Sequence, residues 1–170
     1  LLDPINVSIW VPHAVEVYFD KELKKRLLPY ISIDKIDKYI GDVGFPKEKN
    51  TYELMADDIL RGLSLKELHF KYSWLKSRVS GGFDNGYSID EMEELRKNII
   101  ADPPKEHKYP KIPKGLENFI SDFQKLVYLR TLRTDCLFEI YFRARVIFSE
   151  LEKELGIDSV IHYLPEDLLK

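Results

Sequence analysis

Two arginines, Arg130 and Arg133, interrupt an otherwise apolar stripe in a long predicted helix. The apolar members of the stripe recur at heptad spacing and are Leu116, Phe119, Phe123, Leu126, Leu137, Ile140, Ala144, Ile147 and Leu151. A guanidinium keeps its charge, so its burial on a core face requires carboxylates, a bound anion or water-filled space beside it. The sequence leaves two interpretations open for the arginines: buried ion pairs, or contact with a ligand or a neighbouring domain.

A second candidate for chemistry is the aromatic pair Tyr72 and Trp74, which comes shortly before a glycine-rich turn. Two large rings beside such a turn could form one wall of a flat apolar pocket. The alternative is ordinary packing of both rings in the core at a helix end. The sequence allows both interpretations and favours core packing.

Other reactive side chains form no recognisable constellation. The four histidines, His13, His69, His107 and His162, are far apart and none has metal-ligand spacing, so no metal site is predicted. The only cysteine, Cys136, lies within a helix pattern and is expected to be a small buried hydrophobe. The sequence also lacks the motifs of serine hydrolases and phosphate-binding loops. We therefore predict no catalytic residue and no cofactor in this chain.

Composition limits the class of protein. The 170 residues are 44% hydrophobic and 32% charged, as in ordinary globular proteins. A net charge of −3 argues against general binding of nucleic acid. No apolar run approaches the roughly 18 residues of a membrane span, and no signal peptide pattern opens the chain. Because one cysteine cannot support a disulfide framework, we expect a cytoplasmic location.

Helical periodicity predicts an all-α fold, a helical domain with one very long C-terminal helix. The long helix covers residues 116–155, which contain neither proline nor glycine, and Gly156 is its expected left-handed cap. A helix of this length extends roughly 60 Å. Apolar residues appear on every side of the helix over residues 137–148. We therefore expect other elements to surround that stretch.

Shorter helices are predicted before the long one. One is expected between Pro12 and Pro29, followed by a short helical turn at residues 32–36. Two capping boxes, Ser64–Glu67 and Ser88–Glu91, predict the starts of two further helices.

These elements divide the chain into three parts. Residues 1–100 form a subdomain of short helices. Residues 101–113 contain four prolines and are predicted to form an extended linker. Residues 114–170 comprise the long helix and a connection toward a further domain downstream. The chain is therefore expected to be a fragment of a longer polypeptide.

Three stretches together resemble the helical middle region of phosphoenolpyruvate-utilising enzymes, which include phosphoenolpyruvate synthase, pyruvate phosphate dikinase and rifampin phosphotransferase. The first is residues 71–75 with the following glycine turn and Tyr87, and the second is the arginine-bearing segment 128–133. The third, residues 155–168, is similar to the connection that leads into the swivelling phosphohistidine domain of these enzymes.

In such enzymes an ATP-grasp domain phosphorylates a histidine on the swivelling domain, which carries the phosphoryl group to a second site. A helical domain between them is a spacer, and in the antibiotic-modifying members it binds the acceptor. Residues around His13 lack the glycines and the hydroxyl residue that precede the phosphorylated histidine, so that role is not assigned to His13.

The resemblance thus implies a helical acceptor-binding or spacer domain of a phosphotransferase that is catalytically incomplete alone. Its partners would be the ATP-grasp and phosphohistidine domains of the same polypeptide or complex, with a small-molecule acceptor. The substrate-binding candidates are Arg130, Arg133, Tyr72 and Trp74. The alternative is a stand-alone helical protein-interaction module that binds its partner along the long helix.

Overall fold

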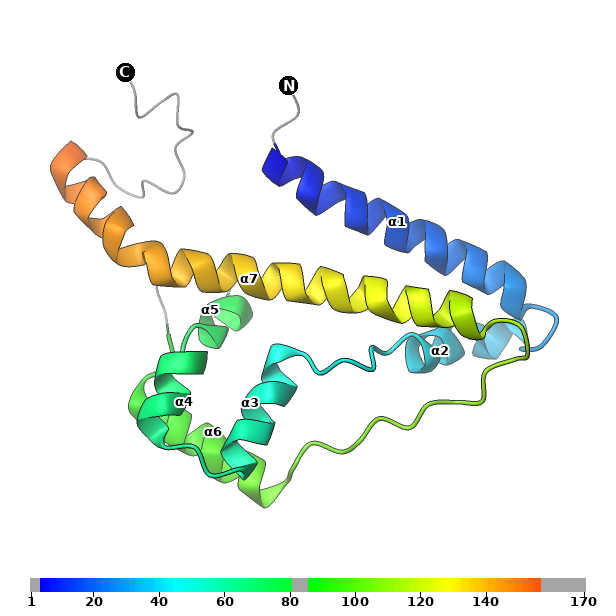
Figure 1. Ribbon diagram of the computed structural model, residues 1–170, viewed down its shortest axis with the longest axis horizontal. Coiled ribbons are helices and arrows are strands. Elements are labelled where there is room, and N and C mark those ends of the chain that lie inside the picture. The colour runs from blue at the N-terminus through cyan, green and yellow to red at the C-terminus, as the bar shows by residue number, and fades with distance from the viewer. Residues whose placement is uncertain (1–3, 81–85, 157–170) are drawn as a thin grey trace. The chain divides into compact units, whose positions relative to one another are not determined.

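The computed structural model describes residues 4–80 and 86–156, and it describes side chains from residue 14 onward except that of Ser80. The described residues form seven α-helices and no strand, which confirms the predicted all-α fold (Figure 1). Most of the predicted glycine turn, at 81–85, and the predicted connection at 157–170 lie outside these residues. The helices are α1 (Pro4–Leu27), α2 (Ile33–Val43), α3 (Thr51–Leu60), α4 (Leu65–Tyr72), α5 (Leu75–Ser80), α6 (Ile89–Ala101) and α7 (Glu117–Leu155).

The chain folds into two compact units, each made of two separate segments. The first unit comprises Leu1–Leu54 and Pro103–Thr134, and the second comprises Met55–Asp102 and Asp135–Lys170. Each unit therefore joins an early part of the chain to a part of α7. The sequence predicted three consecutive parts separated at the proline-rich segment 101–113. That division stays a prediction.

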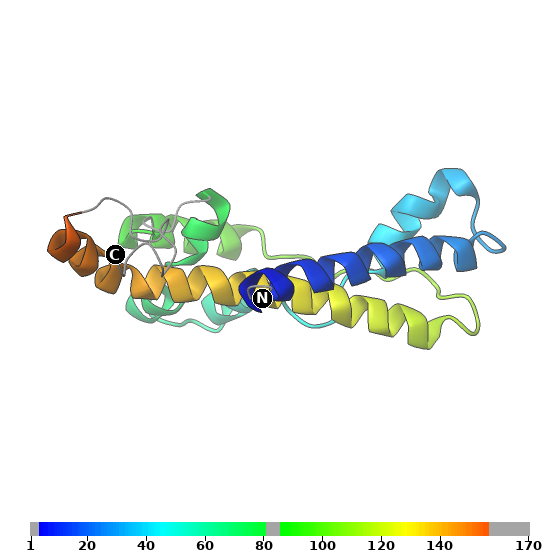
Figure 2. The same cartoon turned by 90° about the horizontal axis from the view of Figure 1, so that it is seen from above.

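In the first unit, α1 lies antiparallel to the first half of α7 (Figures 1 and 2). The rings of Phe19 and Phe119 stack with their centroids 4.9 Å apart, and the guanidinium of Arg26 lies 4.3 Å from the centroid of Phe119. Helix α2 packs against α1. The buried core of this unit is Leu23, Leu27, Ile36, Ile40, Val43, Leu116, Ile120 and Phe123. Burial of each such side chain contributes about 1.5–3 kcal/mol.

Both early helices are longer than predicted. Helix α1 begins at Pro4 and continues through Pro12, since a proline inside a helix removes one backbone hydrogen bond without having to end it. Helix α2 extends over 11 residues where a short turn was expected. Its buried residues, Ile36, Ile40 and Val43, share one face because they are spaced by four and three positions.

The second unit contains α4, α5, α6, most of α3 and the second half of α7, with α4 packed on α6. Both predicted capping boxes are confirmed. The Ser64 hydroxyl accepts a hydrogen bond from the Glu67 amide while the Glu67 carboxylate accepts one from the Ser64 amide, and Ser88 and Glu91 do the same. The buried core is Met55, Ala56, Ile59, Leu68, Tyr72, Trp74, Leu75, Met92, Ile99 and Phe142.

Helix α7 has 39 residues and is followed by Gly156 at a φ of +64°, so its predicted length and left-handed cap are confirmed. Its predicted apolar stripe faces the core only in the first unit. Ile140 and Ile147 are 62% and 64% exposed, and Phe142 is the buried residue of this stretch. The expectation that other elements surround residues 137–148 is therefore wrong for the described part of the chain. A strict heptad stripe drifts around a straight helix by about 20° per heptad, so distant members face different directions.

None of the helices that the structure describes is both long enough and apolar enough to span a membrane.

Candidate functional site

Arg130 is held by a carboxylate from α1. Its Nη1 donates hydrogen bonds to both carboxylate oxygens of Glu16, at 2.6 and 2.7 Å. The side chains of Arg130 and Glu16 are 41% and 16% exposed, so the pair lies at the edge of the first unit rather than inside its core. The structure thus contains an ion pair at Arg130, but a partly exposed one and not the buried pair that the first alternative described. Sequence patterns could not identify Glu16, because it lies 114 residues away along the chain.

Arg133 is half-buried and also has an interaction partner, so it is not a free cation. Its role in substrate binding stays a prediction, as does that of Arg130.

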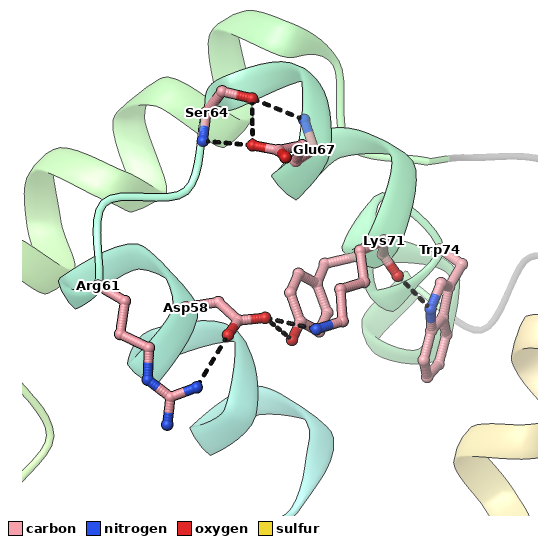
Figure 3. A network of polar contacts seen from close by, with 7 residues as sticks. Asp58, Arg61, Ser64, Glu67, Lys71 and Trp74 are labelled. Atoms are coloured by element: carbon pink, nitrogen blue, oxygen red, sulfur yellow. Dashed lines mark hydrogen bonds and ion pairs between the residues drawn. The ribbon is translucent and has the colours of Figure 1, made fainter.

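Tyr72 and Trp74 are each only 2% exposed and belong to the core of the second unit. The Trp74 indole donates a hydrogen bond to the Lys71 carbonyl at 3.0 Å, and the Tyr72 hydroxyl donates one to Asp58 Oδ2 at 2.7 Å (Figure 3). This is the helix-end packing that the sequence left open as the alternative to a pocket wall.

Asp58 is a buried carboxylate at the centre of this polar network (Figure 3). Lys71 Nζ lies 2.5 Å from Asp58 Oδ2, and Arg61 Nη1 lies 3.6 Å from Oδ1. Hydrogen bonds from Lys71 and Tyr72 lower the pKa of the Asp58 carboxyl, against the opposing effect of its burial. Burial, followed by the bond to Asp58, raises the pKa of the Tyr72 phenol. The network therefore joins α3 to α4.

The first unit contains a cleft of about 300 Å³. No sequence pattern predicted it, because its walls come from α2, the loop that follows, the start of α3 and α7. Ile40, Gly44 and Phe123 are buried and form its floor, while Gly41 and Glu48 are exposed and mark its mouth. The remaining lining residues are Phe45, Pro46, Asn50, Glu53, Val127, Tyr128 and Thr131. Its volume is at the lower end of the range for small-molecule pockets.

The proline-rich segment fixes the loop that lines the cleft. His107 stacks on Phe45 at 4.4 Å between centroids, and its Nε2 lies 2.7 Å from the Asp42 carbonyl oxygen. The Tyr109 hydroxyl donates a hydrogen bond to the Pro46 carbonyl at 2.9 Å. Although residues 103–113 contain no helix, they hold the wall of the cleft in place.

The floor of the cleft is fixed from α7. Gln124 is buried and its Nε2 donates a hydrogen bond to the Val43 carbonyl at 2.7 Å, which satisfies an acceptor at the end of α2. The loop begins at Gly44, next to the ring of Phe123. The cleft is therefore held by hydrogen bonds and packing on two sides.

Carboxylates give the cleft its electrostatic character. Glu48 and Glu53 are its charged lining residues. Glu53 also caps α3 by accepting a hydrogen bond from the Asn50 amide at 2.8 Å. Burial raises the pKa of the nearby Tyr109 phenol, and the negative charges of Glu53, Glu48 and Glu106 raise it further.

Two further predictions from the sequence concern metal ligands and Cys136. Residues 4–80 and 86–156 contain no group of three or more His, Cys, Asp or Glu side chains placed to hold a metal ion. Cys136 is exposed, so its predicted burial is wrong. The core faces of the helix at that point carry Asp135 and Phe138 instead.

Comparisons with models of protein families, with curated proteins and with solved structures find no match for this chain.

Proposed function

We propose that this chain is a helical acceptor-binding or spacer domain of a phosphotransferase similar to phosphoenolpyruvate synthase. It is catalytically incomplete alone and works with an ATP-grasp domain and a phosphohistidine domain of the same polypeptide or complex. The small exposed cleft takes the acceptor. The chain has a single cysteine, Cys136, which forms no disulfide, and this is consistent with a cytoplasmic location.

One observation supports the proposal above the others. Segment 128–133 of α7, which carries the sequence resemblance, contributes Tyr128 and Thr131 to the cleft. Arg130 in the same segment is held by Glu16, so the helix presents Tyr128 and Thr131 from a fixed position. A rigid helix that lines a concave site is well suited to orient a substrate.

The test is phosphoryl transfer by a polypeptide that contains this chain together with its neighbouring domains. With ATP, we expect an acid-labile phosphohistidine at a position outside residues 1–170, and we expect no labelling of the isolated 170-residue chain. Phosphorylation of the isolated chain by ATP, or a polypeptide without any phosphohistidine, would overturn the proposal. Arg130 and Arg133 are not among the residues that line the cleft. Substitution of both by Met therefore tests whether they contact the acceptor outside it: transfer to the acceptor at the normal rate removes them from the site.

A stand-alone protein-interaction module is the second candidate function, and one observation favours it. The second half of α7 carries an exposed apolar stripe, and such surfaces are typical of contacts with other proteins. The stripe consists of Ile140, Ile147, Leu151 and Leu155.

Light scattering coupled to size-exclusion chromatography separates the two candidates. A stable homo-oligomer that dissociates when Ile140 and Ile147 are replaced by Lys would favour the interaction module. A monomer at all concentrations favours the phosphotransferase domain. As a matched control, Lys at the positions of Asp122 and Glu154 adds positive charge to exposed positions of the same helix that lie outside the stripe.

A further inference from the structure

The chemistry of the cleft in the first unit indicates which ligands it selects. Apolar side chains dominate its interior, namely those of Ile40, Phe45, Phe123 and Val127. The cleft volume of about 300 Å³ equals that of roughly ten water molecules in the liquid. The body of a matching ligand is therefore a compact hydrocarbon or a single aromatic ring.

The charged residues that line the cleft indicate which polar group a ligand would carry. Within the described part of the chain, no lysine, arginine or histidine lines the cleft, whereas Glu48 and Glu53 do. Glu48 lies exposed at the mouth. Lys47 and Lys49 flank Glu48 in the sequence but do not line the cleft. Among the lining residues, an anionic group on a ligand would meet only carboxylates, while a cationic group would be attracted.

The carboxylates also act on Tyr109 in the adjacent proline-rich segment. The Tyr109 hydroxyl donates a hydrogen bond to the Pro46 carbonyl. Burial is the largest cause of the raised pKa of this phenol, and the charges of Glu53, Glu48 and Glu106 raise it further. Because the same carboxylates disfavour a negative phenolate here, they favour a positive ligand group at the mouth of the cleft.

The aromatic lining also suits a cation. Phe45, Phe123 and Tyr128 are among the residues that line the cleft, and a cation near the face of an aromatic ring is attracted by its quadrupole. The ring of Phe45 is fixed by its stacking on His107. The site therefore needs little rearrangement to receive a ligand.

We propose that the cleft binds a small organic cation: a protonated amine on a compact aromatic or aliphatic body. The inference deepens the proposed function, and it rests on that function only for the statement that such a cation is the phosphoryl acceptor, through a hydroxyl group of its body and not through its protonated nitrogen.

Three probes of equal size test the charge preference on the full 170-residue chain by isothermal titration calorimetry. They are 2-phenylethylamine, which is protonated at pH 7, neutral 2-phenylethanol and anionic phenylacetate. The amine can form two exposed ion pairs and one cation–π contact that the alcohol cannot form. We therefore expect the amine to bind about tenfold more tightly than the alcohol. We expect the anion to bind most weakly. Equal affinities for amine and alcohol, tighter binding of the anion, or no binding of any probe would overturn the proposal.

Variants then locate the binding site. Glu48→Gln with Glu53→Gln removes both charges, and the amide oxygen introduced at position 53 can still accept the bond from the Asn50 amide. The double variant is expected to lose the preference for the amine and to keep its affinity for the alcohol. The matched control is Glu94→Gln with Glu154→Gln, which changes the net charge equally at two exposed positions of the second unit. A control that weakens amine binding as much as the test pair would contradict a local site.

Filling the cleft provides a second, independent readout. Gly41 lines the mouth, and a β-carbon added there meets no atom within 4 Å. Gly41→Phe should therefore abolish binding of the amine and of the alcohol. Circular dichroism verifies that each variant is folded. Unchanged binding by a folded Gly41→Phe chain would place the ligand elsewhere and overturn the proposal.

Failure of the inference is distinguishable from failure of the proposed function. If the amine binds but the complete polypeptide phosphorylates no hydroxyl-bearing analogue of it, the cleft is confirmed as a binding site for organic cations and its role in acceptor binding is overturned. If the complete polypeptide with Gly41→Phe transfers a phosphoryl group at an unchanged rate, the proposed phosphotransferase function is retained and the cleft is not its acceptor site.

Discussion

Gly44 lies so close to the ring of Phe123 that a β-carbon on Gly44 would be 2.6 Å from Phe123 Cε1. The same carbon would be 2.8 Å from the Ile40 carbonyl oxygen. Both distances are shorter than van der Waals contact. The absence of a side chain at Gly44 therefore allows the loop after α2 to meet α7 and close the floor of the cleft.

Gly44→Ala should destabilise the protein by about 1–3 kcal/mol, since the buried Phe123 ring has to shift. Urea unfolding followed by circular dichroism measures the change. Gly41→Ala is the matched control, because a β-carbon there meets open space in the middle of α2. It should stabilise the chain by about 0.5–1 kcal/mol, since alanine restricts the unfolded chain more than glycine does. Changes of the same sign at the two glycines would contradict this account.

Arg130 and Glu16 should be energetically coupled, but weakly. A double-mutant cycle with Arg130→Met and Glu16→Gln should give a coupling energy of about 0.5–1 kcal/mol, because the pair is partly exposed. Arg130→Met alone should be the most harmful variant, as it leaves the less exposed Glu16 without its cation. The coupling should decrease in high salt. Strict additivity of the two substitutions in urea unfolding would show that the ion pair contributes nothing.

The Asp58 network makes stability depend on pH. Because the pKa of Asp58 is lowered on folding, its stabilising contribution is complete above the ordinary value of about 3.9 and is lost as the pH falls toward the lowered value. Asp58→Asn should cost about 1–3 kcal/mol at neutral pH. The variant should also lose less stability than the original protein on acidification below about pH 4. Unfolding midpoints between about pH 2.5 and pH 7 measure both effects, and parallel curves for the two proteins would rule out the assignment.

Tyr72→Phe separates the hydroxyl of the network from its charge. It removes one buried hydrogen bond to Asp58 and should cost about 0.5–1.5 kcal/mol in the free energy of unfolding. The acid-dependent loss of stability should remain, since the Asp58–Lys71 pair is intact. A phenylalanine variant as stable as the original protein would show that the hydroxyl contributes nothing to the core.

Cys136 should react with a thiol reagent in the folded protein. Its side chain is exposed, so a disulfide reagent such as Ellman's should label one thiol per chain without denaturant. A protected thiol that is labelled only in urea would match the burial expected from sequence and contradict the structure. Cys136→Ser, in turn, should change the free energy of unfolding by about 0.5 kcal/mol or less, as expected for an exposed position.

Local signals in the sequence determined much of the secondary structure. Both capping boxes, the length of α7 and the left-handed conformation of Gly156 are set by interactions within a few residues, and all were predicted. The start of α1 was predicted wrongly, because the effect of Pro12 on a helix depends on the packing of the residues that follow.

The tertiary structure alone decided which side chains come together. The partner of Arg130 and the exposure of Cys136 depend on how helices pack. The cleft is formed by segments that are remote in sequence, so no local pattern could reveal it. Periodicity identifies the faces of a helix from a few neighbouring residues, but which face is covered depends on contacts between residues that lie many positions apart.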